Sequence, residues 1–127
     1  RQERVQHVLD LAASTWDPGR ADHLTTFPLP SPRPTIIVGV NSVSLSRLAG
    51  RSADGINVQW NRPRRDEFLA AADETAGDRP FLRTAYHSYD AALLDPEHPT
   101  RREMTDRRID RLVLAEFGAA PEFPVSV

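Results

Sequence analysis

The chain has 127 residues, with 16 basic and 18 acidic side chains and a formal net charge of −2. This length suits one domain, and the near-balanced charge gives no basic field that would favour nucleic acid or a membrane surface. The lack of cysteine excludes disulfides, cysteine-ligated zinc and a thiol nucleophile, and no apolar run approaches the roughly 20 residues that cross a bilayer. We therefore expect a cytoplasmic protein that binds neither nucleic acid nor membranes.

The chain opens with a one-sided apolar stripe from Val5 to Trp16, which predicts an amphipathic helix. Trp16 is interpreted as core packing at the end of this helix. Four prolines between positions 28 and 34 then predict an extended connection. Because the chain begins with Arg1 and within a helical pattern, we expect it to be part of a longer protein.

A strand, a short helix and a second strand are predicted next. Residues 35–39 form an almost wholly apolar run, typical of a strand in a parallel sheet. Gly39 permits a tight turn, and Asn41 or Ser42 is expected to cap the helix that follows. The second strand is predicted at residues 55–59.

A longer helix and a third strand follow in the same order. The helix is predicted from about residue 62 to residue 76, with Asn61 as its N-cap and Gly77 as its C-cap residue. Residues 81–89 are predicted as the third strand.

The last unit is shorter and more polar. Residues 90–99 are predicted as a loop. The pattern Thr100-Arg-Arg-Glu103 predicts a capping box, which starts a helix that ends at about residue 108. The fourth strand is predicted at residues 109–114, and residues 119–127 form a tail without periodicity.

One segment carries a family resemblance. After the proline-rich lead, the apolar strand and the glycine turn come residues 47–58, Arg-Leu-Ala-Gly-Arg-Ser-Ala-Asp-Gly-Ile-Asn-Val. This order resembles the luciferase-like monooxygenase superfamily, whose members are TIM-barrel oxidoreductases that use FMN or the deazaflavin coenzyme F-420. The resemblance extends more weakly over most of the chain and covers only the C-terminal part of such a protein.

The resemblance implies an α/β fold in which residues 1–118 form a parallel (βα) half-barrel, the C-terminal half of a TIM barrel. An open sheet with helices on both faces is the alternative fold. A half-barrel leaves two bare edges and an apolar concave face. We therefore expect a covering partner, either a missing N-terminal half or a second copy of the chain, and a homo-oligomer.

The resemblance also places a coenzyme-phosphate site after the first strand, at Gly39, Val40, Asn41 and Ser42. Free N–H groups at a helix start favour a phosphate, although the superfamily has a pair of glycines where this chain has Asn41 and Ser42. A basic residue of some F-420-dependent relatives corresponds to Arg62, whose guanidinium suits phosphate oxygens. Turning and capping roles, or a solvated Arg62, remain the alternatives.

Three further features of the sequence are candidates for chemistry. His87 at the end of the third strand is a candidate proton donor, with simple packing as the alternative. Glu116, beside Phe117, is a candidate acid at the mouth of the site, with a merely solvent-exposed glutamate as the alternative. Asp95, Glu97 and His98 lie together, but two prolines in that loop make poor metal geometry, so no metal site is expected.

The sequence thus predicts the C-terminal fragment of a flavin- or deazaflavin-dependent oxidoreductase or monooxygenase that acts on a small organic substrate. The resemblance favours F-420 over FMN, because all 16 basic residues are arginine and this composition suits the GC-rich organisms in which that coenzyme is common. The fragment alone is expected to be inactive, since the residues that handle the reactive ring lie on earlier strands in the superfamily. The alternative is a non-catalytic α/β module that self-associates or binds a partner protein.

Overall fold

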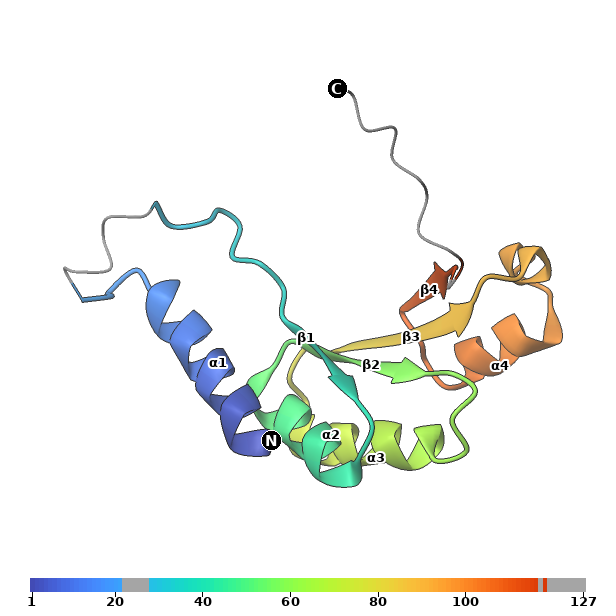
Figure 1. Cartoon of the computed structure of the whole chain (residues 1–127), viewed down its shortest axis with the longest axis horizontal. Coiled ribbons are helices and arrows are strands. Elements are labelled where there is room, and N and C mark those ends of the chain that lie inside the picture. The colour runs from blue at the N-terminus through green and yellow to red at the C-terminus, as the bar shows by residue number, and fades with distance from the viewer. Residues whose placement is uncertain (22–27, 117, 119–127) are drawn as a thin grey trace, which may run out of the picture.

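The computed structural model of the protein describes residues 1–21, 28–116 and 118. Strands and helices alternate along these residues (Figure 1). The order is α1 (Gln2–Thr15), β1 (Ile37–Val40), α2 (Val43–Ser52), β2 (Gly55–Gln59), α3 (Arg65–Ala76), β3 (Leu82–Ser88), the 3-10 helix η2 (Ala91–Leu94), α4 (Pro99–Asp106) and β4 (Arg111–Ala115). The predicted tail at 119–127 lies outside the described residues.

The four strands form one parallel sheet in the order β1-β2-β3-β4. The predicted parallel α/β fold is therefore confirmed. The predicted range 55–59 matches β2, and the other predicted strands differ from β1, β3 and β4 by one or two residues at their ends. No helix of the described residues is long and apolar enough to cross a membrane.

All four α-helices pack on one face of the sheet. The register places Val40, Val58 and Ala85 side by side, and these residues belong to a single buried cluster. The same cluster contains one or more side chains from each α-helix: Leu9, Leu45, Leu48, Ala49, Phe68, Leu69, Ala72 and Met104. Figure 1 shows α1, α2 and α3 on the same side of the strands. This arrangement differs from the alternative with helices on both faces.

The other face of the sheet has no helix of the described residues over it. The register places Gly39, Asn57, Thr84 and Arg111 in one row of that face. Its outer strands carry apolar side chains that water reaches, since Ile37 is 36% exposed and Val113 is 51% exposed. We call this the open face. An apolar surface of this kind is typical of a sheet that another element covers.

The segment Ala53-Asp54-Gly55, part of the motif noted in the sequence, has a structural role at the start of β2. The Asp54 carboxylate accepts hydrogen bonds from Ile36 N (2.8 Å) and from Arg33 (2.8 and 3.0 Å). Gly55 has no space for a side chain, because an added Cβ would lie 2.6 Å from Leu82 O. These contacts fix β2 between β1 and β3.

Two predicted helix starts were wrong. α3 begins at Arg65 after a turn in which Arg62 N donates to Gln59 O (3.1 Å), and Asn61 does not cap it. The Asn61 amide instead lies 3.2 Å from His87 Nε2. The predicted C-cap residue Gly77 is confirmed, with a φ of 59°.

The capping box at Thr100 and Glu103 was also wrong. α4 begins one residue earlier, at Pro99, and His98 Nδ1 accepts from Thr100 N (3.2 Å). Glu103 is drawn to Arg65 on α3 and so does not reach back to the helix start. Within the predicted loop 90–99, residues 91–94 form η2, whose first turn is capped by Asp90.

An arginine network around Trp60 joins α3 to α4. The Arg65 guanidinium stacks on the Trp60 ring with its Cζ 4.0 Å from the centroid, and Arg65 also pairs with Glu103. Arg107, just after α4, pairs with Asp66 of α3 (2.7 Å) and lies over the same ring (6.0 Å). Trp60 is 1% exposed, so the indole holds both arginine stems at the end of β2.

The Asp66–Arg107 pair makes the free energy of unfolding depend on pH in the acid range. The hydrogen bond from Arg107 lowers the pKa of Asp66 below the ordinary value of an aspartate. A carboxyl group whose pKa is lowered by folding stabilises the protein above its unfolded-state pKa, and this contribution is lost as the pH falls through the folded-state pKa. This stabilising contribution is therefore lost below about pH 4.

We expect Asp66→Asn to lower the free energy of unfolding at pH 7 by about 0.5 kcal/mol, a small amount because the Asp66 side chain is 57% exposed. The difference from the unsubstituted protein should shrink below about pH 4. Urea unfolding at a series of pH values measures it, with Asp78→Asn in the turn after α3 as the control. A difference that stayed constant down to pH 2 would contradict this assignment.

Candidate functional site

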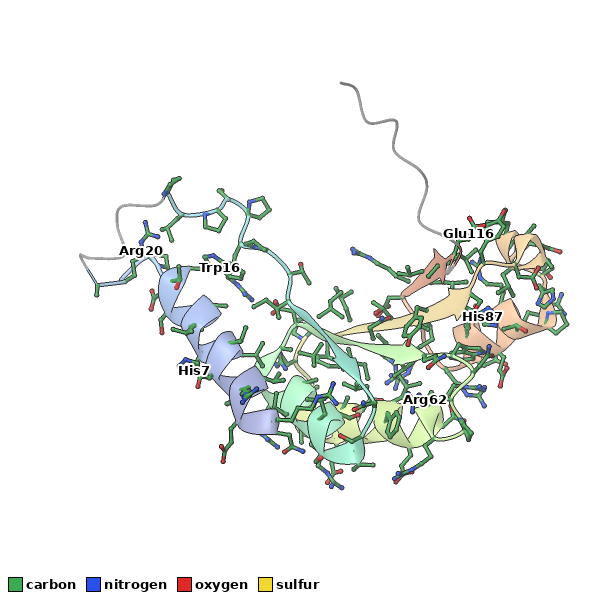
Figure 2. The ribbon with its side chains drawn as sticks, in the orientation of Figure 1. His7, Trp16, Arg20, Arg62, His87 and Glu116 are labelled. Atoms are coloured by element: carbon green, nitrogen blue, oxygen red, sulfur yellow. The ribbon has the colours of Figure 1, made fainter. Side chains whose placement is uncertain are left out.

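The candidate site lies where the strands end. Parallel strands with right-handed helix connections bring all their carboxyl ends to one edge of a sheet, and the loops at that edge build the sites of parallel barrels. Figure 2 shows Arg62, His87 and Glu116 at this edge, after β2, at the end of β3 and after β4, while Trp16 and Arg20 lie toward the far end of α1. Here we call this edge the C-terminal rim.

A cleft of about 210 Å³ opens at the C-terminal rim over β1, β2 and β3. Its lining combines residues from the start of α1, the end of β1 and the turn after it, the open face, and the loop after β2. These residues are Arg1, Gly39, Val40, Asn41, Asn57, Gln59, Arg62 and Tyr86. Among the described residues, its lining thus holds two arginines and no carboxylate. The electrostatics of the cleft favour an anion.

Gln59 positions Arg62 in this cleft. The backbone N–H of Arg62 donates to Gln59 O (3.1 Å), and its side-chain Nε donates to Gln59 Oε1 (3.2 Å). Nη1 and Nη2 of Arg62 have no hydrogen-bond partner in the part of the chain that the structure describes. A guanidinium held at Nε with both terminal nitrogens available suits two oxygens of a phosphate.

The floor of the cleft is a polar row on the open face. Asn57 and Gln59 are two residues apart on β2, and Tyr86 lies opposite Gln59 on β3. Beneath them, Thr84 Oγ1 lies 2.8 Å from both Ile56 O and Asn57 Oδ1, which fixes the Asn57 amide. The floor therefore offers amide and phenol groups for hydrogen bonds to a bound molecule.

The predicted phosphate residues after β1 divide into two roles. Gly39, Val40 and Asn41 line the cleft. Ser42 does not line it, because its hydroxyl accepts from Leu45 N (3.2 Å) and caps α2. The prediction that Gly39 serves a tight turn was wrong, since Gly39 lies inside β1, where an added Cβ would meet no atom within 4 Å. Its missing side chain leaves the cleft open.

The other predicted side chains lie outside this cleft. His87 is on the helix-covered face, with Nδ1 2.7 Å from Ser88 O and Nε2 beside Asn61. Glu116 lines a separate cleft of about 300 Å³ with Ser88 and Tyr89. Phe117 lies outside the described residues. The structure therefore does not bring His87 and Glu116 together with Arg62.

The loop before α4 uses its polar groups locally. Asp95 Oδ1 accepts from Glu97 N (2.9 Å), Glu97 pairs with Arg102, and His98 caps α4. Within the residues that the structure describes, no group of three or more histidine or acidic side chains is arranged to hold a metal ion.

Two larger clefts lie at the opposite edge of the sheet, where the strands begin. They have volumes of about 360 and 310 Å³ and share Arg33 and Asp54, which pair with each other. Because these groups already bond to each other and to the start of β1, we assign them a structural role.

Sequence reasoning missed the contributions of Asn57 and Tyr86 to the cleft. The signal for Asn57 was the alternation Ile56-Asn57-Val58-Gln59, which separates an apolar face from a polar face with period two. The position of Tyr86 beside Gln59 depends on the register between β2 and β3, which residue types alone do not give.

Comparisons of the chain with models of known protein families, with curated proteins and with solved structures gave no match.

Proposed function

We propose that this chain is the C-terminal half of a luciferase-like (βα) barrel oxidoreductase, and that the cleft at the C-terminal rim holds the phosphate of F-420 or FMN. The observation that carries the proposal is the meeting of Asn41 and Arg62 in one cleft without a carboxylate among the described lining residues. The family assignment comes from the resemblance of residues 47–58. We also infer a cytoplasmic protein, since the chain has no cysteine.

The residues of this chain bind and orient the coenzyme in this proposal. Arg62 directs Nη1 and Nη2 to the phosphate while Gln59 holds Nε. Asn41 contributes polar groups beside the start of α2, where the helix dipole favours negative charge. The coenzyme supplies hydride transfer or oxygen activation on a small organic substrate. His87 stays a candidate proton donor only if it turns away from Asn61.

The proposal includes a partner that covers the open face, either an N-terminal half of the same protein or a second copy. Water would otherwise reach the bound coenzyme from that side, so the uncovered chain should bind coenzyme weakly and be catalytically inactive. F-420 is preferred over FMN because the chain has arginine and no lysine, a composition that suits the GC-rich organisms in which F-420 is common.

A second candidate is a non-catalytic α/β module that self-associates or binds a partner protein. The exposed Ile37 and Val113 on the open face favour it. The two functions differ in coenzyme affinity, because a module of this kind has no reason to bind F-420 or FMN.

Replacing Arg62 by alanine should weaken F-420 binding about tenfold or more, since a charge-assisted phosphate contact contributes roughly 1.5–3 kcal/mol. Fluorescence titration of the protein with F-420, and separately with FMN, measures the dissociation constants. Circular dichroism should show an unchanged fold, because the Arg62 side chain is exposed and, among the described residues, it bonds only to Gln59.

Arg51→Ala is the matched control. Arg51 is exposed in the last turn of α2, which lies at the edge of the sheet where the strands begin, so this change removes the same charge far from the cleft. Equal affinities of the Arg62→Ala and Arg51→Ala proteins would remove the phosphate role of Arg62. Absence of F-420 and FMN binding by the unsubstituted protein would favour the binding module.

A further inference from the structure

α1 has one flank that lacks a partner in the described structure. In this fold α2, α3 and α4 each connect two adjacent strands and lie over the groove between them, whereas α1 precedes β1. Gln2 and Gln6 of α1 bond to Ser44 and Ser52 of α2, so that flank faces α2. Two apolar side chains lie on the opposite flank, where Val8 is 62% exposed and Leu11 is 52% exposed.

The last strand, β4, has apolar side chains that no helix fully covers, which complements the uncovered flank of α1. Leu112 and Leu114 of β4 point to the helix-covered face, because Leu112 lies opposite Ala85 of the core, and both are only half-buried. α4 covers the groove between β3 and β4, and no helix of the described residues covers the outer side of β4. The outer side of β4 therefore lacks an apolar helix like α1, which lies beside β1 at the other edge of the sheet.

β1, β2 and β3 begin in one row of the register, at Ile37, Gly55 and Leu82, but the later strands are offset toward the C-terminal rim. β3 continues two residues past the end of β2, since Gln59 is opposite Tyr86 and β3 ends at Ser88. β4 begins two residues after the start of β3, since Arg111 is opposite Thr84. A progressive stagger of this kind is what allows a parallel sheet to close into a barrel, and a sheet with two free edges is a liability in solution.

We propose that two copies of this chain close a barrel around a two-fold axis, with β4 of each copy paired in parallel with β1 of the other. This inference rests on the half-barrel of the proposed function and takes a second copy, and not an N-terminal half, as the covering partner. Four strands from each copy make the eight of a closed parallel barrel. In this arrangement Val8 and Leu11 of one copy cover Leu112 and Leu114 of the other. The open faces turn toward each other and bury Ile37 and Val113. A two-fold contact in which β1 meets β4 on both sides is self-complementary.

Sedimentation velocity tests the proposal directly. The protein should sediment at twice its chain mass of 14.2 kDa. The double variant Val8→Glu/Leu11→Glu should raise the dimer dissociation constant by roughly 100-fold, because a charge placed in an apolar contact loses its hydration. Both side chains are exposed in the single chain, so circular dichroism should show that the variant still folds.

Leu94→Glu is the matched control. Leu94 is as exposed as Val8, at 62%, but lies on η2, outside α1 and both outer strands. This variant should remain a dimer. A folded unsubstituted protein that sediments as a monomer at about 100 μM would overturn the proposal, and so would a dimer that Val8→Glu/Leu11→Glu leaves unchanged. An effect of Leu94→Glu equal to that of the double variant would also overturn it.

Cysteine cross-linking tests which edges meet, and the chain contains no cysteine of its own. Continuing the stagger by one strand brings Ile37 of one copy beside Val113 of the other. Oxidation of a mixture of the Ile37→Cys and Val113→Cys proteins should therefore link the two, while neither protein alone should link to itself. Self-linked Ile37→Cys protein would show that β1 meets β1 and would overturn the arrangement. No coenzyme is present in these tests, so their failure is distinct from failure of the phosphate site.

Discussion

Trp60→Ala is expected to lower the free energy of unfolding by about 3–5 kcal/mol, the usual loss for a buried tryptophan. The ring is 1% exposed and belongs to the same buried cluster as Phe68 and Met104, so its removal leaves a cavity between β2, α3 and α4. It also removes the surface on which Arg65 and Arg107 lie. Urea unfolding followed by far-ultraviolet circular dichroism measures the change.

Trp16→Ala makes the same chemical change at a half-buried position after α1. We expect it to lower the free energy of unfolding by about half as much or less, because less apolar area returns to water. If the two tryptophan variants unfolded at the same urea concentration, Trp60 would not have the central role in packing that its burial indicates.

Gly50→Ala is expected to destabilise the protein by about 1–3 kcal/mol, the range for an overpacked core. Gly50 is buried where α2 crosses α3, and an added Cβ would overlap Ala72 O and Thr75 Oγ1. Thr75 can rotate, but the backbone carbonyl of Ala72 can move only if the helices separate. Alanine favours a helix over glycine by roughly 0.5–1 kcal/mol, so Gly50→Ala would stabilise the protein if α2 and α3 were not in close contact. A lowered free energy of unfolding therefore tests the close crossing.

Gly39→Ala is the control for this substitution. An added Cβ at Gly39 would meet no atom within 4 Å, so the free energy of unfolding should stay the same or rise by up to about 1 kcal/mol. A stabilised Gly50→Ala protein would mean that α2 and α3 lie farther apart than described. The crossing matters for the site because these two helices support β1 and β2, which carry half of the residues that line the cleft.

The strands were predictable because their signals are local, and their parallel order follows from short right-handed connections. The apolar run of β1 lies between breakers, and Ile56-Asn57-Val58-Gln59 alternates, so each strand is recognisable without knowledge of its neighbours. The helix starts at Asn61 and Thr100 were mispredicted for the opposite reason. His87 engages Asn61 and Arg65 engages Glu103 from distant parts of the chain, and such contacts override local capping preferences.

The candidate site was partly predictable for the same reason. Gly39 and Val40 end β1 while Asn41 and Arg62 come after strand ends, and the rule that parallel strands end at one rim is enough to expect them together. The capping role of Ser42 depends on where α2 begins, and the place of Tyr86 depends on the register of β3. Neither is fixed by residue type alone.

The central claim is that the cleft over β1, β2 and β3 at the C-terminal rim receives the coenzyme phosphate. Amide NMR of the protein titrated with F-420 tests it most directly. The account predicts that the largest shift changes fall on Gly39–Asn41 and Gln59–Arg62. Changes centred instead on Arg33 and Asp54, at the opposite edge of the sheet, or no changes at saturating F-420 and FMN, would contradict it.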